Sequence, residues 1–96
     1  MTIEKTVNGN EITLALKGWL DTQASSDLEE ALGALGDQCA KLVFDLSELE
    51  YISSSGVRQI VAAHKQMGGE LYLKNTPDNV LSVFKAIGID RKLKFQ

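Results

Sequence analysis

Hydrophobic and polar residues alternate through the first part of the chain. The alternating positions on one side are Ile3, Lys5, Val7, Ile12, Leu14 and Leu16. Alternation on both sides of Asn8-Gly9-Asn10 predicts two antiparallel strands joined by a tight turn. If Gly9-Asn10 form the turn, the apolar residues of the two strands match, whereas moving the turn back by one residue loses this match. The expected cross-strand pairs are Asn8 with Glu11, Val7 with Ile12, Lys5 with Leu14, and Ile3 with Leu16.

Apolar residues at spacings of three and four predict three helices. The first helix has its apolar stripe at Ala24, Leu28, Ala31, Leu32 and Leu35. Asp21 or Thr22 can cap the start of this helix, and Gly36 can end it. The predicted ranges are about Thr22 to Leu35, the serines at 53–55 to Gly68, and Thr76 to Gly88.

Short apolar runs between the helices predict further strands. These are Leu42–Phe44, Leu71–Leu73 and a short final segment at Lys92–Phe95. Strand–helix–strand units pair in parallel through right-handed crossovers. The order therefore predicts an α/β fold with a small mixed β-sheet, an N-terminal antiparallel hairpin plus parallel strands. Binding sites in such sheets gather beyond the carboxyl ends of the parallel strands, where we expect Ser53–Gly56 and Asp21 to lie.

The composition restricts the kinds of protein that the chain can be. Its 96 residues predict one domain spanning residues 1–96. A net charge of −3 argues against a nucleic-acid partner, which would need a basic face. No apolar run has the ~18 residues of a membrane span, and Met1–Lys5 lacks the apolar character of a signal peptide. The single Cys39 cannot form an internal disulfide, so we expect a reducing cytoplasm and a half-buried Cys39.

The segment Ser53-Ser54-Ser55-Gly56 lies where a strand and a loop lead into the second predicted helix. A serine hydroxyl is a favoured N-cap because it accepts a hydrogen bond from a free backbone N–H of the first turn. The same helix start can accommodate an anion. The anion could come from a ligand or from phosphorylation of a serine. A simpler alternative is that the three serines only cap the helix.

Catalytic chemistry has little support among the residues. Gly56 follows a serine, but the sequence has no Gly-x-Ser-x-Gly elbow. His64 lies on the apolar stripe of its helix, where a packed or half-buried side chain explains it better than a catalytic base. Asp45, Glu48 and Glu50 can be read as an acid/base pair, yet a solvated loop explains the glutamates and a loop cap explains Asp45. With no metal-ligand pair and no phosphate-binding glycine loop, we expect no catalytic residues, no metal and no cofactor.

The stretch Asp45-Leu46-Ser47, followed by Tyr-Ile-Ser-Ser-Ser-Gly-Val at 51–57, resembles the signature of the STAS domain family. The resemblance is to the bacterial anti-sigma factor antagonists (anti-anti-sigma factors) of that family. It extends over nearly the whole chain and includes Gly18–Asp21. The resemblance implies a small mixed sheet with helices mainly on one face, which agrees with the order predicted above.

The resemblance also implies a phosphorylation switch. Antagonists of this type commonly carry Asp-Ser-Ser-Gly, and a partner kinase, the anti-sigma factor itself, phosphorylates the first serine. That serine corresponds to Ser54, and Ser53 stands in place of the aspartate. The unphosphorylated antagonist binds the anti-sigma factor and frees the sigma factor, and a PP2C-type phosphatase restores binding. The implied partner-binding residues are Asp21, Ser53, Ser54, Ser55, Gly56 and Arg58.

We therefore interpret the chain as a cytoplasmic, non-enzymatic regulator of transcription, switched at Ser54, that enters no membrane. Arg58 lies four residues after Ser54 and so within reach of a phosphate there. Ser53 and Ser55 are competing acceptors. One alternative keeps the fold but makes the chain a stand-alone STAS subunit that regulates a membrane transporter without phosphorylation. Another is a small enzyme or nucleotide binder that uses the same loop.

Overall fold

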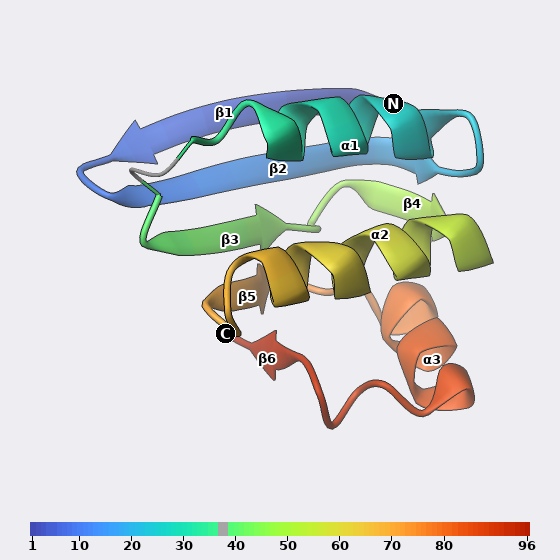
Figure 1. Ribbon diagram of the computed structural model, residues 1–96. Helices are drawn as coiled ribbons and strands as arrows, with labels where there is room; N and C mark the ends of the chain where they lie inside the picture. Colours follow the sequence, from blue (N-terminus) through green and yellow to red (C-terminus); the bar gives the residue numbers. More distant parts are fainter. Residues whose placement is uncertain (37–38) are drawn as a thin grey trace.

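The computed structural model describes residues 1–36 and 39–96, which form a six-stranded sheet and three helices (Figure 1). The strands are β1 (Thr2–Asn8), β2 (Glu11–Leu20), β3 (Lys41–Asp45), β4 (Leu49–Ile52), β5 (Leu71–Lys74) and β6 (Lys94–Phe95). The helices are α1 (Ala24–Gly33), α2 (Ser54–Gln66) and α3 (Asp78–Ile87). Among the described residues, no helix is long and apolar enough to cross a membrane.

The sheet is mixed, as the order of elements predicts. The order of the strands in the sheet is β1-β2-β3-β5-β6. β1 pairs antiparallel with β2, and the pairs β2–β3, β3–β5 and β5–β6 are parallel. β3 pairs with the first half of β2, and β4 pairs in parallel with its last residues. Figure 1 shows β3 and β4 following one another along β2. The carboxyl ends of β2 and β4 therefore lie next to each other.

The predicted register of the hairpin is confirmed. Asn8 faces Glu11, and Lys5 faces Leu14 on the exposed edge strand β1. Gly9 has a φ of +64°, the left-handed conformation that glycine adopts most easily at the first central position of a hairpin turn. The observed register therefore matches the apolar residues of the two strands across a turn that begins at Gly9.

β4 is a strand that the sequence pattern does not predict. The pattern indicates a solvated loop that carries Glu48 and Glu50, and the structure shows that this interpretation is wrong for Leu49–Ile52. Leu49 and Ile52 are buried, whereas the two residues between them are exposed. Two consecutive exposed residues break the alternation by which a strand is recognised in a sequence.

A β-bulge causes this break in alternation. Leu49 pairs with Gly18 and Tyr51 pairs with Trp19, so Glu50 is an extra residue in β4 with no partner on β2. A bulge of this kind turns the side chains that follow it to the opposite faces of the sheet. Tyr51 consequently points away from the core instead of sharing the buried side with Leu49.

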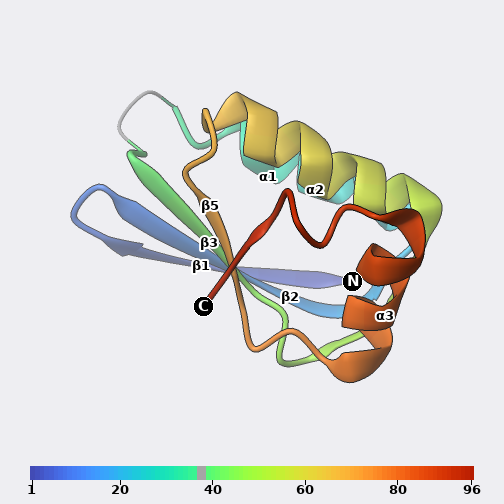
Figure 2. The ribbon, with the colours of Figure 1, turned by 90° about the horizontal axis from the view of Figure 1, so that it is seen from below.

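The helices lie mainly on one face of the sheet (Figure 2). α1 and α2 pack side by side there, and α3 packs against β4 at the end toward which β2, β3 and β4 point. The helix ends lie close to the predicted ones. Gly88 ends α3 with a left-handed φ of +85°, whereas α1 begins two residues after the expected Thr22. The last strand is limited to Lys94–Phe95.

The hydrophobic core fills the space between the sheet and the helices. Side chains from both layers are at most 6% exposed: Ile12, Leu14, Leu16 and Leu20 of β2, Leu28 of α1, Ile60 of α2 and Phe84 of α3. The predicted apolar stripes thus form one core. The half-buried positions of Cys39 and His64 also agree with the sequence.

Gly56 allows the start of α2 to approach β2 and β4 closely. A Cβ atom at this position would lie 2.7 Å from the carbonyl oxygen of Leu20 and 2.9 Å from Cγ1 of Ile52. Real Cβ atoms do not approach other heavy atoms so closely, and the first of these neighbours is a backbone oxygen that cannot rotate away. The glycine is therefore required by packing between the helix and the two strands.

We expect Gly56→Ala to destabilise the fold by about 2 kcal/mol, because overpacking of this kind displaces backbone. In thermal unfolding, that loss corresponds to a fall in Tm of roughly 10 °C for a domain of this size. The matched control is Gly33→Ala in α1, where a Cβ would meet no atom within 4 Å. The control should leave Tm unchanged or raise it, and equal effects of the two variants would contradict the packing argument.

Candidate functional site

The candidate site lies where the ends of β2 and β4 lead into two helices. The backbone N–H of Ser53 donates to the carbonyl oxygen of Leu20 at 2.9 Å, which extends the parallel ladder by one step beyond β4. The residues that follow β2 lead into α1, and the residues that follow β4 form the first turn of α2. Two helix starts therefore lie side by side at the carboxyl ends of the strands, as the sequence predicts.

The three serines of the loop have different environments. Ser53 is the N-cap of α2, and its hydroxyl accepts a hydrogen bond from the N–H of Gly56 at 3.1 Å. The Oγ of Ser55 lies 3.4 Å from the Oγ1 of Thr22, at the end of the neighbouring loop. Ser54 is exposed, and its hydroxyl contacts no partner among the described residues. Of the three, Ser54 therefore presents the most accessible hydroxyl.

Asp21 follows the last residue of β2 and stands between two residues that contact the serine loop. Its carboxylate Oδ1 accepts a hydrogen bond from the N–H of Ala24 at 2.9 Å, so Asp21, rather than Thr22, supplies the side-chain cap of α1. The residue before it, Leu20, bonds to Ser53, and the residue after it, Thr22, contacts Ser55. The structure thus brings Asp21 beside the serine loop, at a fixed position.

A groove of about 320 Å³ runs between the starts of α1 and α2. Its lining consists of Thr22, Ser25, Ser26, Glu29, Ser55, Arg58 and Gln59. The lining is rich in hydroxyl groups, and Arg58 supplies a cation on the exposed side of α2. Of this lining, the sequence predicts Ser55 and Arg58 as site residues. It does not predict the other five, Thr22, Ser25, Ser26, Glu29 and Gln59. Their place depends on the pairing of β2 with β4, and recognition of β4 in the sequence would have indicated it.

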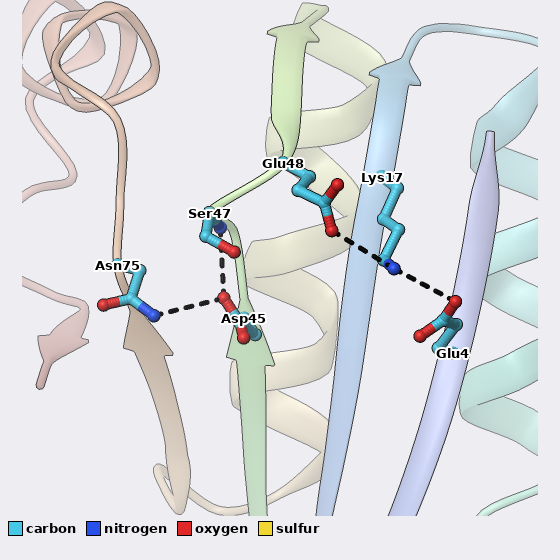
Figure 3. Close-up of polar contacts among 6 residues, drawn as sticks. All are labelled: Glu4, Lys17, Asp45, Ser47, Glu48 and Asn75. Atoms are coloured by element: carbon cyan, nitrogen blue, oxygen red, sulfur yellow. Dashed lines mark hydrogen bonds and ion pairs between the residues drawn. The ribbon is translucent and has the colours of Figure 1, made fainter.

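The connection between β3 and β4 is held by polar contacts (Figure 3). Oδ1 of Asp45 accepts hydrogen bonds from the N–H of Ser47 at 3.1 Å and from Nδ2 of Asn75 at 3.4 Å. Burial raises the pKa of Asp45, but these hydrogen bonds and the charge of Lys74 outweigh it, so the pKa lies below its ordinary value. Asp45 therefore caps the loop, as the sequence predicts.

A charged cluster lies beside this loop on the face of the sheet that has no helix (Figure 3). Nζ of Lys17 lies 3.0 Å from a carboxylate oxygen of Glu4 and 3.1 Å from one of Glu48. Hydrogen bonds to these two glutamates raise the pKa of Lys17. Glu48 is thus an ion-pair partner on the surface, and its position does not make an acid/base pair with Asp45.

His64, the candidate base, lies far from the serine loop. His64 lies ten residues after Ser54 on α2, which places it about 15 Å further along the helix axis. That distance is too long for a base that would activate the hydroxyl of Ser54. In the described part of the chain, no group of three or more metal-ligating side chains comes together.

Comparison with known proteins gives a consistent picture. The family model described as "Mlab, STAS domain" matches residues 3–94. The anti-sigma-B factor antagonist of Bacillus subtilis (strain 168) is 29% identical over 85 residues, which cover 85% of this chain and 78% of that protein.

Solved structures of two anti-sigma factor antagonists share the fold. The unphosphorylated form of SpoIIAA has a TM-score of 0.83 at 19% identity and covers 99% of this chain and 88% of its own. An antagonist from Mycobacterium paratuberculosis has a TM-score of 0.87 at 23% identity and covers 98% of this chain and 83% of its own. The mixed sheet and its three helices are therefore a known architecture.

Removal of the hydroxyl of Ser53 should destabilise the domain, because Gly56 N–H then loses its capping partner. We expect Ser53→Ala to cost about 1 kcal/mol in the free energy of unfolding, measured by urea denaturation. Ser54→Ala is the matched control and should change that free energy by less than about 0.5 kcal/mol, because the Ser54 side chain is exposed. The reverse order would show that Ser54 is the cap.

Asp45 should contribute stability that depends on pH. Because its pKa is lower in the folded chain than in the unfolded chain, its contribution is fully present above the unfolded carboxyl pKa of about 3.9. The contribution is lost as the pH falls through the folded-state value. Asp45→Asn should therefore lower the free energy of unfolding at pH 7 by about 1 kcal/mol, allowing for its partial exposure.

Thermal unfolding of wild type and Asp45→Asn between pH 7 and pH 2.5 measures this effect. The difference between the two proteins should shrink toward the acid end of the range. Glu29→Gln, at an exposed position of α1, serves as the control and should follow the wild type throughout. A difference between wild type and Asp45→Asn that stays constant across the range would exclude titration of Asp45 as its origin.

Proposed function

This chain belongs to the STAS domain family, which contains the anti-sigma factor antagonists, and we propose that it is such an antagonist, switched by phosphorylation of Ser54. In its unmodified form it binds an anti-sigma factor that has serine kinase activity, and the bound sigma factor is released. Phosphorylation of Ser54 by that kinase ends the interaction, and a PP2C-type phosphatase restores it. The cycle takes place in the cytoplasm and needs no cofactor. Anti-sigma factor antagonists are regulators, not enzymes.

The observation that carries the proposal is the exposure of Ser54 at the start of α2. The hydroxyl of Ser53 is engaged in the cap and that of Ser55 faces Thr22, whereas Ser54 is free to enter the active site of a kinase. Ser53 replaces the aspartate of the family motif without loss of the cap, because serine and aspartate are equally good N-caps. The geometry therefore favours the serine that the family motif indicates.

The physical effect of the phosphate falls on the surface and not on the fold. It adds about −1.5 to −2 charges at a helix start, where the helix dipole favours negative charge by roughly 0.3–1 kcal/mol. Arg58, one helical turn further on, offsets part of this charge. A partner surface fitted to a neutral serine would instead have to desolvate a doubly charged group, which costs several kcal/mol. Release follows from this difference.

Incubation of the chain with the anti-sigma kinase of its source organism and ATP tests the modification. Mass spectrometry of the peptide should locate the phosphate on Ser54, and Ser54→Ala should abolish it. Ser53→Ala and Ser55→Ala are the matched controls and should still be phosphorylated. Phosphate found mainly on Ser53 or Ser55 would refute the assignment.

Binding measurements with the same kinase test the switch. Ser54→Asp should bind at least about 30-fold more weakly than wild type, the equivalent of 2 kcal/mol. Ser54→Ala should bind like wild type but resist release by ATP. Both should melt within a few degrees of wild type, because the Ser54 side chain is exposed. A chain that co-purifies with a membrane transporter, and that no kinase modifies, would favour the role of a transporter subunit.

A further inference from the structure

Trp19 and Tyr51 form an exposed aromatic pair at the ends of β2 and β4. Their side chains are 58% and 46% exposed, and their ring centroids lie 5.3 Å apart. We propose that this pair is the apolar anchor of the interface with the anti-sigma kinase, a second contact beside the phosphorylated serine. The proposal rests on the function proposed above and adds to it the residues that hold the partner.

The bulge in β4 creates the pair. Leu49 points into the core, so regular alternation would place Tyr51 on the same buried side. The extra residue Glu50 shifts the alternation of the side chains by one position. Tyr51 is therefore exposed beside Trp19, and Ile52 is buried. Bulges occur next to functional sites, where they re-aim a side chain.

The backbone around the bulge is fixed, so the pair is a preformed surface. The carbonyl oxygen of Glu50 accepts a hydrogen bond from Nδ2 of Asn79 on α3 at 2.9 Å. The N–H of Gly18, beside Trp19, donates to the carbonyl oxygen of Glu48 at 3.0 Å. Rigid aromatic side chains lose little conformational entropy when a partner covers them, which is one reason why Trp and Tyr dominate interface hot spots.

The pair lies near the candidate site, at the same end of the sheet but on its helix-free face. Tyr51 is three residues before Ser54, so their Cα atoms lie at most about 11 Å apart. A standard interface covers about 800 Å² on each partner, a patch roughly 30 Å across. One partner that reaches Ser54 with its kinase active site can therefore cover Trp19 and Tyr51 as well.

The charges around the pair indicate what kind of surface covers it. Glu50 is exposed on β4, Glu48 is exposed on the turn before it, and Asp21 lies two residues after Trp19. Lys17 pairs with Glu48 and neutralises part of this charge, but the carboxylates still outnumber the lysine. An acidic rim repels nucleic acids and anionic membranes and is complementary to a protein surface that carries Lys or Arg around an apolar pocket. Guanidinium groups also stack favourably on Trp and Tyr faces. The expected contact surface on the kinase is therefore basic at its rim and apolar at its centre.

The single tryptophan of the chain is a direct reporter of this contact. The chain is labelled with 5-fluorotryptophan, which gives one ¹⁹F resonance. This resonance is recorded with and without the purified kinase that phosphorylates Ser54, and the kinase has ADP bound. We expect the resonance to shift and to lose its sensitivity to exchange of H₂O for D₂O. The isolated chain at increasing concentration provides the reference, and shielding of Trp19 there would show instead that a second copy occupies the pair.

Affinity measurements with the same kinase complete the test. Trp19→Ala and Tyr51→Ala should each weaken binding about tenfold or more. Val7→Ala is the matched control, because Val7 is an apolar residue of similar exposure, 59%, on β1. Val7 lies beside the hairpin turn, next to the start of β2, so its removal should leave the affinity within about twofold of wild type. Circular dichroism and Tm of each variant exclude unfolding as the cause, and Trp19→Phe, which retains a ring, should recover part of the lost affinity.

The outcomes separate the two proposals. If the kinase phosphorylates Ser54 but neither shields Trp19 nor distinguishes Trp19→Ala from wild type, the aromatic anchor is wrong while the phosphorylation switch stands. If no kinase modifies Ser54, the proposed function fails and the anchor fails with it. Shielding of Trp19 together with the loss of affinity in both aromatic variants supports the anchor.

Discussion

The parallel pairing of β2 with β4 is the constraint on which the candidate site depends. The hydrogen bond from Ser53 to the carbonyl of Leu20 at 2.9 Å extends this ladder and fixes the point at which α2 begins. The same carbonyl would lie 2.7 Å from a side chain at Gly56, so only glycine lets the helix start there. Because α1 follows β2 directly, the two helix starts are held side by side. Asp21 and the serines thus owe their proximity to one pair of strands.

The same pair of strands gives the molecule two chemically different surfaces at one end. Toward the helices it presents hydroxyl groups and Arg58 around a polar groove. On the opposite face it presents the rings of Trp19 and Tyr51. Polar groups at helix starts respond strongly to added charge, whereas aromatic rings contribute affinity that depends little on charge. A partner that contacts both surfaces would gain affinity from the aromatic rings, and added charge at the helix start would control whether it stays bound.

Stability and regulation are supplied by separate parts of the structure. Most of the folding free energy comes from buried residues such as Leu20, Ile60 and Phe84, which are 0% exposed. The polar contacts of Asp45 and Lys17 lie at the surface, where solvent weakens each of them to a small contribution. Charge can therefore change at the exposed Ser54 without disturbing the core, which a phosphorylation switch requires.

The sequence by itself determined the elements whose side chains alternate or recur regularly. It predicted the hairpin register, three helices and the mixed sheet. Each of these depends on a hydrophobic periodicity or on turn residues that can be recognised within a short stretch of sequence. It also located the serine loop and offered Asp21 or Thr22 as the cap of the first helix, a choice that the structure decides in favour of Asp21. Only the tertiary structure decided that Leu49–Ile52 is a strand, that Ser53 is the cap and Ser54 the exposed hydroxyl, and that Trp19 meets Tyr51. These features depend on pairing between segments about thirty residues apart, and a bulge that breaks the alternation leaves no periodic signal in the sequence.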